Sequence, residues 1–170
     1  ILMTTQRRKE MVLTEEKLKA IFPKAPPDKI KAYGPVFGKA CEAMGFNTPK
    51  RIAALLGQIG VESGELRYDK ELPSVYNKKD PKDKAEPTGT LYEGRKNLGN
   101  LQPGDGPKFI GRGVLQLTGR ENYTLYGKKL GLDLVGNPEL ACSPEVSVKI
   151  ACQYFKDRKL DEAADKWDLD

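Results

Sequence analysis

Apolar side chains recur every three or four positions in five stretches of this 170-residue chain, a spacing typical of the buried face of an α-helix. Thr48-Pro49 is the clearest helix start, because Thr is a favoured N-cap and Pro is tolerated at the first helical position. Gly45 and Gly131 follow two of the stretches, where glycine commonly ends a helix. The pattern predicts helices over residues 14–22, 28–44, 48–64, 120–130 and 143–155.

The rest of the chain predicts less regular structure. Residues 1–13 are predicted to be a tail. Residues 68–108 are rich in Pro, Gly, Lys and Asp, which favours irregular loops with one short helix or hairpin, and scattered Tyr and Leu residues suggest that this part lines a cleft. Residues 109–118 are apolar and broken by glycines, which predicts a strand-like segment. We expect one domain over residues 14–170, with an irregular smaller lobe over about 68–118.

The composition excludes several classes of function. No apolar run approaches the 18 residues of a membrane span, and no N-terminal stretch has the apolar core of a signal peptide. The chain has no His, which removes Ser-His-Asp and Cys-His catalysis and most zinc sites. Its three cysteines lack CxxC spacing and are expected to be buried, reduced thiols. Acid–base chemistry must therefore rest on carboxylates, Lys, Tyr or Cys, and we expect no metal or cofactor.

The net charge of +5 is unevenly distributed along the chain. Residues 1–60 hold 11 basic and 5 acidic side chains, whereas residues 121–170 hold 7 basic and 10 acidic ones. A mildly basic protein suits an anionic polymer or surface as its partner. No basic stripe with interleaved aromatic residues is present, so nucleic acid is not the expected partner.

Glu62 is the first candidate for chemistry. On a helical wheel it flanks the apolar stripe of the predicted helix 48–64 and lies in its last turn, just before Gly64. Partial burial and the negative end of the helix both favour the protonated form that a general acid requires. Gln58, one turn earlier, can hydrogen-bond it. A glutamate that simply reaches solvent at a helix end would give the same pattern.

A second carboxylate is needed for glycosidic cleavage, in which one group protonates the leaving oxygen and the other acts on water or the sugar cation. Glu71 follows Glu62 by nine residues in the irregular segment. Spacing alone does not choose it over its rivals, which are Glu65, Asp69, Glu93 and Asp105.

Neutral polar side chains follow the Gly111-Arg112-Gly113 sequence. Gln116 and Thr118 alternate on the strand-like segment and would face one side, where such groups can hydrogen-bond sugar hydroxyls and N-acetyl groups. An ordinary glycine-rich turn and an edge strand would give the same pattern.

In combination these features strongly resemble glycoside hydrolase family 19, in its bacterial and phage form of chitinases and peptidoglycan-degrading endolysins. The resemblance covers about residues 28–168, and its most specific part is the segment 109–123. In chain order it rests on Gln58-Ile-Gly-Val-Glu-Ser-Gly64, Glu71, Tyr92-Glu-Gly-Arg95, Leu98-Gly-Asn100, Gly104-Asp-Gly106 and Phe109-Ile-Gly-Arg-Gly-Val-Leu-Gln-Leu-Thr-Gly-Arg-Glu-Asn-Tyr123.

The resemblance implies a mainly α (α+β) fold, a lysozyme-like domain of two lobes with a substrate cleft. It implies that Glu62 is the catalytic acid, that Glu71 is the second carboxylate and that Thr118 helps to hold the attacking water. Glu93 is the alternative second carboxylate, because plant-type members place theirs further along the chain. The expected substrate-binding residues are Gln58, Tyr68, Gln116, Asn122 and Arg112.

Three features depart from the family pattern. Val61 stands where members usually carry His, and Glu65 stands where a second Gly is common. Members also usually continue beyond Asp170, so we expect this chain to be C-terminally truncated relative to them.

We predict a monomeric endolysin that cleaves β-1,4 bonds of peptidoglycan with inversion, made in the host cytoplasm and acting on the wall in the periplasm or outside the cell. The alternatives are a chitinase and a catalytically inactive wall-binding module.

Overall fold

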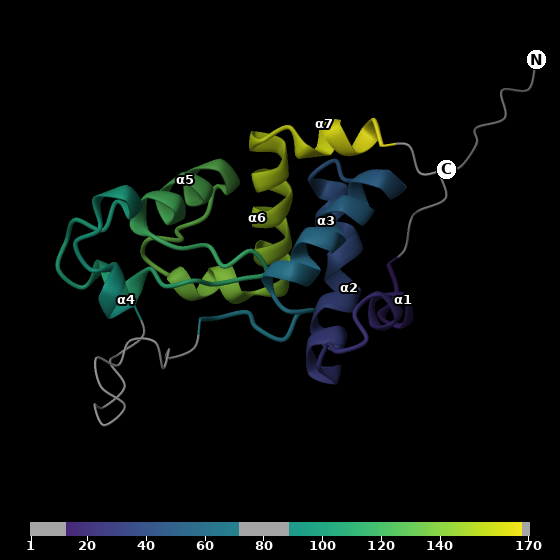
Figure 1. Ribbon diagram of the computed structural model, residues 1–170, viewed down its shortest axis with the longest axis horizontal. Coiled ribbons are helices and arrows are strands. Elements are labelled where there is room, and N and C mark those ends of the chain that lie inside the picture. Colours follow the sequence, from purple (N-terminus) through teal and green to yellow (C-terminus); the bar gives the residue numbers. More distant parts are fainter. Residues whose placement is uncertain (1–12, 72–88, 168–170) are drawn as a thin grey trace, which may run out of the picture.

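The computed structural model describes residues 13–71 and 89–167. Helices α1 (Glu15–Ile21), α2 (Pro27–Ala43), α3 (Pro49–Glu62) and α7 (Leu160–Asp165) form one lobe. Helices α4 (Asp105–Lys108) and α5 (Arg120–Leu130) form the other, together with the short 3-10 turns η2 (Thr90–Tyr92), η3 (Lys96–Leu98) and η4 (Pro138–Cys142). Helix α6 (Pro144–Asp157) stands between the two lobes (Figure 1). The predicted mainly helical, two-lobed fold is confirmed.

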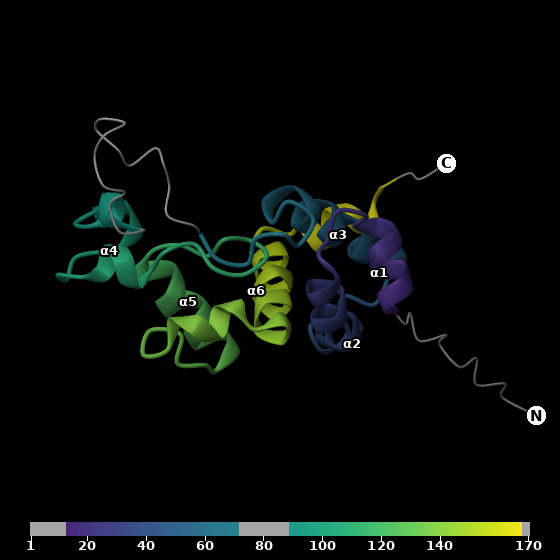
Figure 2. The same cartoon turned by 90° about the horizontal axis from the view of Figure 1, so that it is seen from below.

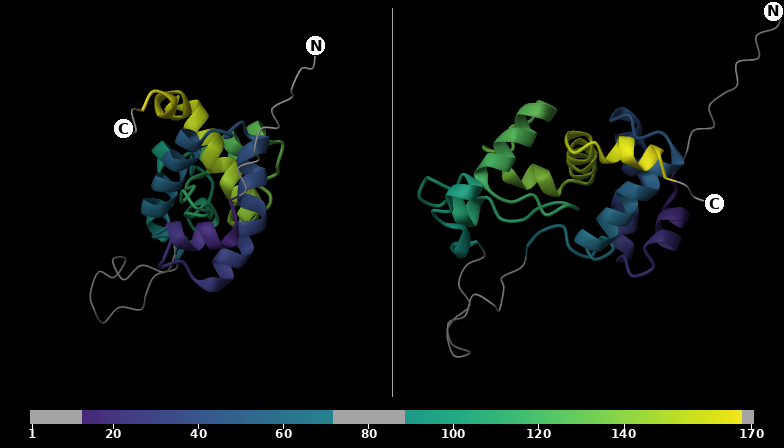
Figure 3. Two further views of the ribbon diagram at one scale, coloured as in Figure 1. Left: turned by 90° about the vertical axis from the view of Figure 1, so that its right-hand side faces the viewer. Right: turned by 45° about the horizontal axis from the view of Figure 1, so that its top comes forward.

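Each lobe has its own apolar core, and α6 contributes to both. The larger cluster packs residues of α1, α2 and α3 against Val148, Ala151 and Phe155 on one face of α6. The smaller cluster packs Phe109, Tyr123 and other residues of the second lobe against Ile150. Figure 2 and the right-hand view of Figure 3 show α6 between the two groups from two further directions. Helix α6 therefore links the two cores, and the loop 109–118 links them as well, with Val114 in the larger cluster and Leu117 in the smaller one.

The predicted helices are confirmed, because their start signals are local. The Oγ1 atoms of Thr14 and Thr48 accept hydrogen bonds from the backbone amides of Lys17 and Arg51, at 3.2 and 3.3 Å. Helix α2 differs in detail, since it begins at Pro27 and Asp28 lies in its first turn instead of capping it. Of the predicted tail, residues 1–12 lie outside the described ranges, while Leu13 is buried in the larger core.

The predicted strand over residues 109–118 is wrong. Within the described ranges this segment forms only two isolated bridges, Lys70 with Arg112 and Arg112 with Leu117. The backbone turns back at Gly113 (φ 74°) and Gln116 (φ 52°), which breaks the extended conformation. A Cβ atom at Gly113 would lie 2.6 Å from the carbonyl oxygen of Ala141, so this turn requires glycine. The segment is a tight loop.

Helix α7 was not predicted from the sequence. It follows Lys159, whose left-handed backbone (φ 55°) gives no recognisable start signal. Contacts with α3 hold it, because the Arg51 guanidinium binds both carboxylate oxygens of Asp165 at 2.6 to 3.1 Å. The three cysteines are free, with Cys41 and Cys152 buried as predicted and Cys142 only half-buried. No helix in the described ranges has the length and apolar character of a membrane span.

Candidate active site

Glu62 is the last residue of α3, at the edge of the first lobe. The Gln58 Nε2 amide donates a 2.8 Å hydrogen bond to its Oε1 atom, as predicted. The residue is exposed, although we expected partial burial beside the apolar stripe. The stripe itself is buried through Ile52, Leu55 and Ile59, and Glu62 lies just outside it. Solvent and Gln58 therefore surround this carboxyl group in the free protein.

The chain leaves α3 through a turn of three consecutive left-handed residues. Gly64, Glu65 and Leu66 have φ values of 58°, 61° and 64°, and two of them carry side chains that disfavour this conformation. Leu66 is fully buried, and the Glu65 carboxylate accepts a 2.9 Å hydrogen bond from the backbone amide of Lys24. The Tyr68 ring packs over Gly64, lies 5.6 Å from the Arg67 guanidinium and is 47% exposed.

Glu71 is held on both carboxylate oxygens. Oε1 accepts a 2.8 Å hydrogen bond from the phenol of Tyr92, and Oε2 accepts one of 3.1 Å from the backbone amide of Gly111. The Glu71 amide in turn donates to the Gly111 carbonyl at 2.8 Å. The residue is half-buried. This carboxylate is therefore fixed against the loop 109–118.

Gly111 is the point at which three predicted site residues meet. A Cβ atom at this glycine would lie 2.8 Å from Gln116 Oε1, 3.3 Å from Thr118 Oγ1 and 3.4 Å from Glu71 Oε2. Gln116 and Thr118 thus share one side as predicted, but a tight turn places them there and not a strand. Any larger residue at position 111 would occupy the space between the three polar groups.

Glu93 is placed differently from Glu71. Its two oxygens accept hydrogen bonds from the backbone amides of Gly104 and Gly106, each at 2.7 Å. This carboxylate closes the loop between η2 and α4, and none of the contacts in the described part of the chain joins it to Glu71 or Thr118. Glu71 shares the space at Gly111 with Thr118, and its role as second carboxylate stays a prediction.

Arg112 was predicted to bind substrate, and the structure argues against that role. Its guanidinium is buried and donates to the Lys108 carbonyl at 2.9 Å, to the Tyr123 hydroxyl at 3.0 Å and to Glu139 at 2.9 Å. Burial raises the pKa of Tyr123 to about 12, so the phenol stays protonated. Arg112 ties the base of the loop 109–118 to the second lobe, and Asn122 supports the same loop by donating to the Thr118 carbonyl at 2.8 Å.

The comparisons with known proteins agree on one family. The family described as chitinase class I, the glycosyl hydrolase 19 group, matches residues 31–164. A protein of Haemophilus influenzae named for a glycosyl hydrolase family 19 domain is 31% identical over 170 residues, which cover 89% of this chain and 82% of that protein. The chain belongs to glycoside hydrolase family 19.

Other family 19 members match over shorter parts. Chitinase 11 of rice is 41% identical over 70 residues, 41% of this chain but only 27% of the rice protein. A crystal structure of a bacterial family 19 chitinase superposes with a TM-score of 0.62 at 25% identity, over 85% of this chain and 67% of that one. The chain therefore shares the lysozyme-like family 19 fold and is shorter than these chitinases.

Most predicted family 19 site residues surround the Gly111 loop or the end of α3, but one neighbour was missed. Tyr92 contacts Glu71, which lies 21 positions earlier in the chain, and no local sequence pattern predicts such a contact. Its presence in the Tyr-Glu-Gly-Arg sequence was the only available signal.

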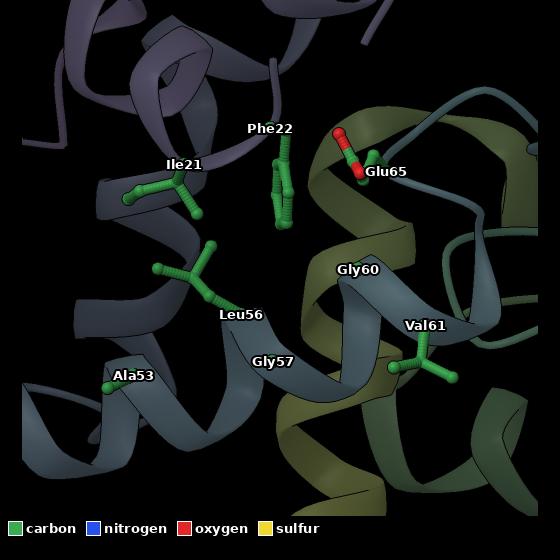
Figure 4. Close-up of a pocket in the computed structure, with 8 residues that line it drawn as sticks. All are labelled: Ile21, Phe22, Ala53, Leu56, Gly57, Gly60, Val61 and Glu65. Carbon is green, nitrogen blue, oxygen red and sulfur yellow. The ribbon is translucent and has the colours of Figure 1, made fainter. Parts of the chain in front are cut away.

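A separate apolar groove lies between α1 and α3. It encloses about 530 Å³ and is lined by Ile21, Phe22, Ala53, Leu56, Gly57, Gly60, Val61 and Glu65. Figure 4 shows Phe22 directed towards Gly60, with Ile21 and Leu56 at the α1 end of the groove. Glu62 does not line this groove.

Proposed function

We propose that this chain is an endolysin of phage type that hydrolyses β-1,4 glycosidic bonds of peptidoglycan. The observation that carries the proposal is the arrangement of Glu71, Gln116 and Thr118 around Gly111, with a second carboxyl group, Glu62, at the end of α3. A pair of carboxyl groups flanking the scissile bond is the arrangement that most glycosidases use for this hydrolysis. The net charge of +5 supports an anionic wall polymer as substrate. We propose that the enzyme works on the wall, in the periplasm or outside the cell.

In the proposed mechanism, Glu62 donates a proton to the bridging oxygen of the scissile bond. Glu71 accepts a proton from a water molecule on the opposite face of the sugar, and the Thr118 hydroxyl helps to hold that water. Each oxygen of Glu71 already accepts one hydrogen bond, but each also has a second acceptor position, so water can still bind. Attack from the face opposite the leaving group inverts the anomeric centre.

A chitinase is the second candidate, favoured by the names of the rice relative and of the solved bacterial structure. Zymograms on gels containing peptidoglycan and gels containing glycol chitin separate the two functions. The proposal predicts clearing on peptidoglycan, lost in Glu62→Gln and kept in Glu42→Gln, an exposed glutamate of α2. Clearing on glycol chitin alone would identify a chitinase. Binding without clearing on either gel would identify an inactive wall-binding module.

A further inference from the structure

We propose that Tyr92 is a positioning residue for Glu71, an inference that rests on the role proposed for that carboxylate. Its hydroxyl donates a 2.8 Å hydrogen bond to Oε1, while the Gly111 amide holds Oε2. A carboxylate held at one oxygen can still swing about its side-chain torsions. A carboxylate held at both oxygens by groups from different parts of the chain cannot.

The protonation of Tyr92 suits a permanent donor. Burial raises its pKa above the ordinary value of 10.0, and the hydrogen bond to Glu71 and the nearby negative charge raise it further, whereas Arg95 opposes them. Ionisation would place a phenolate against a carboxylate, which explains the sign of the shift. The phenol therefore remains a donor throughout the neutral range.

Tyr92 is itself held firmly by the second lobe. Its carbonyl accepts a 2.9 Å hydrogen bond from the Asn100 side chain, and its amide donates to the Gly89 carbonyl at 2.9 Å. The Arg95 guanidinium lies 5.6 Å from the centre of its ring. The next residue, Glu93, fastens the loop to Gly104 and Gly106. The fold of residues 89–106 thus places the Tyr92 hydroxyl against Glu71. In this proposal Glu93 acts only indirectly, by holding the loop that carries Tyr92.

The test compares Tyr92→Phe with Tyr154→Phe, which alters a half-buried tyrosine of α6 beside Arg158. Initial rates are measured on soluble fragments of the polymer that the zymograms show to be cleaved. We expect Tyr92→Phe to lower kcat about 10-fold, the effect of one lost hydrogen bond to a charged group, with little change in KM. The control should keep the wild-type kcat. In a Glu71→Gln background, Tyr92→Phe should have no further effect.

A fluorinated tyrosine at position 92 separates positioning from a purely structural role. This residue keeps the ring and the donor but ionises at lower pH. We expect a normal kcat at neutral pH and a loss of activity that sets in at lower alkaline pH than in the wild type. A wild-type kcat in Tyr92→Phe, with Glu71→Gln inactive, would overturn this inference alone. A fully active Glu71→Gln enzyme would overturn the role of Glu71 as well.

Discussion

Gln58 and Glu62 lie one turn apart on α3, and the amide of the first donates a 2.8 Å hydrogen bond to the Oε1 atom of the second. This bond occupies one carboxyl oxygen and leaves Oε2 without a protein donor among the contacts described. In the proposed mechanism, Oε2 is therefore the oxygen from which Glu62 would donate a proton to the substrate. Gln58 thus contacts Glu62 in the free protein, and the sugar-binding role expected for it stays a prediction.

Replacing Glu62 by Gln should abolish cell-wall hydrolysis and leave the fold intact. The side chain is exposed, so its neutral replacement disturbs no core contact. General acid catalysis contributes about 10²–10⁴-fold, and we expect at least that loss in the lysis rate of permeabilised cells. Circular dichroism and the melting temperature should match the wild type. Normal lysis by the folded variant would remove Glu62 from the mechanism.

Glu71→Gln and Glu93→Gln should affect different properties. Glu71→Gln should lower the hydrolysis rate by about 10²-fold or more, because the water loses its general base. Glu93→Gln removes one acceptor for a loop amide, so its main effect should be a loss of about 1 kcal/mol in unfolding free energy. Rate and urea denaturation measurements on both variants decide the assignment. An inactive Glu93 variant beside an active Glu71 variant would reverse it.

The first product of hydrolysis should be the α-anomer. Glu71 and Thr118 are assigned to a water on the face opposite the leaving group, and attack from that face inverts the β-linkage. Proton NMR within minutes of mixing the enzyme with a soluble β-linked oligosaccharide reports the anomer before it equilibrates. Early β-anomer would show retention and would exclude the proposed water-activating role.

Arg112→Lys should destabilise the protein without raising KM. Lysine keeps the charge but loses the planar fork that reaches Lys108, Tyr123 and Glu139. We expect a loss of about 2–3 kcal/mol in urea denaturation. Lys70→Met is the control, since it removes the exposed ion pair to the same Glu139 and should cost less than about 1 kcal/mol. A raised KM with unchanged stability would restore the substrate-binding role.

The ion pair between Asp105 and Arg120 should make stability depend on pH in the acid range. The Arg120 guanidinium holds the pKa of the buried Asp105 below its ordinary value of 3.8. The stabilisation is therefore complete above pH 3.8 and is lost as the pH falls through the lower folded-state value. Urea denaturation should be measured from pH 7 down to about pH 2. Over this range, the difference in unfolding free energy between the wild type and Asp105→Asn should decrease. A constant difference would contradict this linkage.

The sequence predicts the helices well where their signals are local. Thr48 and Pro49 mark a helix start within two residues, and Gly131 marks an end, because caps depend on neighbours three or four positions away. It fails where the decisive partner is distant. The sequence of the loop 109–118 predicts a strand. In the structure, however, the Gly113 amide donates a 2.7 Å hydrogen bond to the Asp69 carbonyl, and Gly113 packs against Ala141.

In the candidate site, too, the sequence identifies some residues but does not give their distant contacts. Glu62, Glu71 and Thr118 could be named from the family resemblance, and their catalytic roles stay predictions. The contacts of Glu93 and Arg112 could not be derived, because charged residues look alike in a sequence whether they bind a ligand or a backbone. Their partners lie 4 to 27 positions away, and only the folded chain identifies them.

The shared helix α6 has a consequence for cooperativity. Val148, Ala151 and Phe155 belong to one core, and Ile150 on the same helix belongs to the other. If one lobe unfolds, one face of α6 loses its apolar contacts, and the other lobe packs against the same helix. Thermal unfolding should therefore follow a single transition, and a cavity in either core should weaken both lobes.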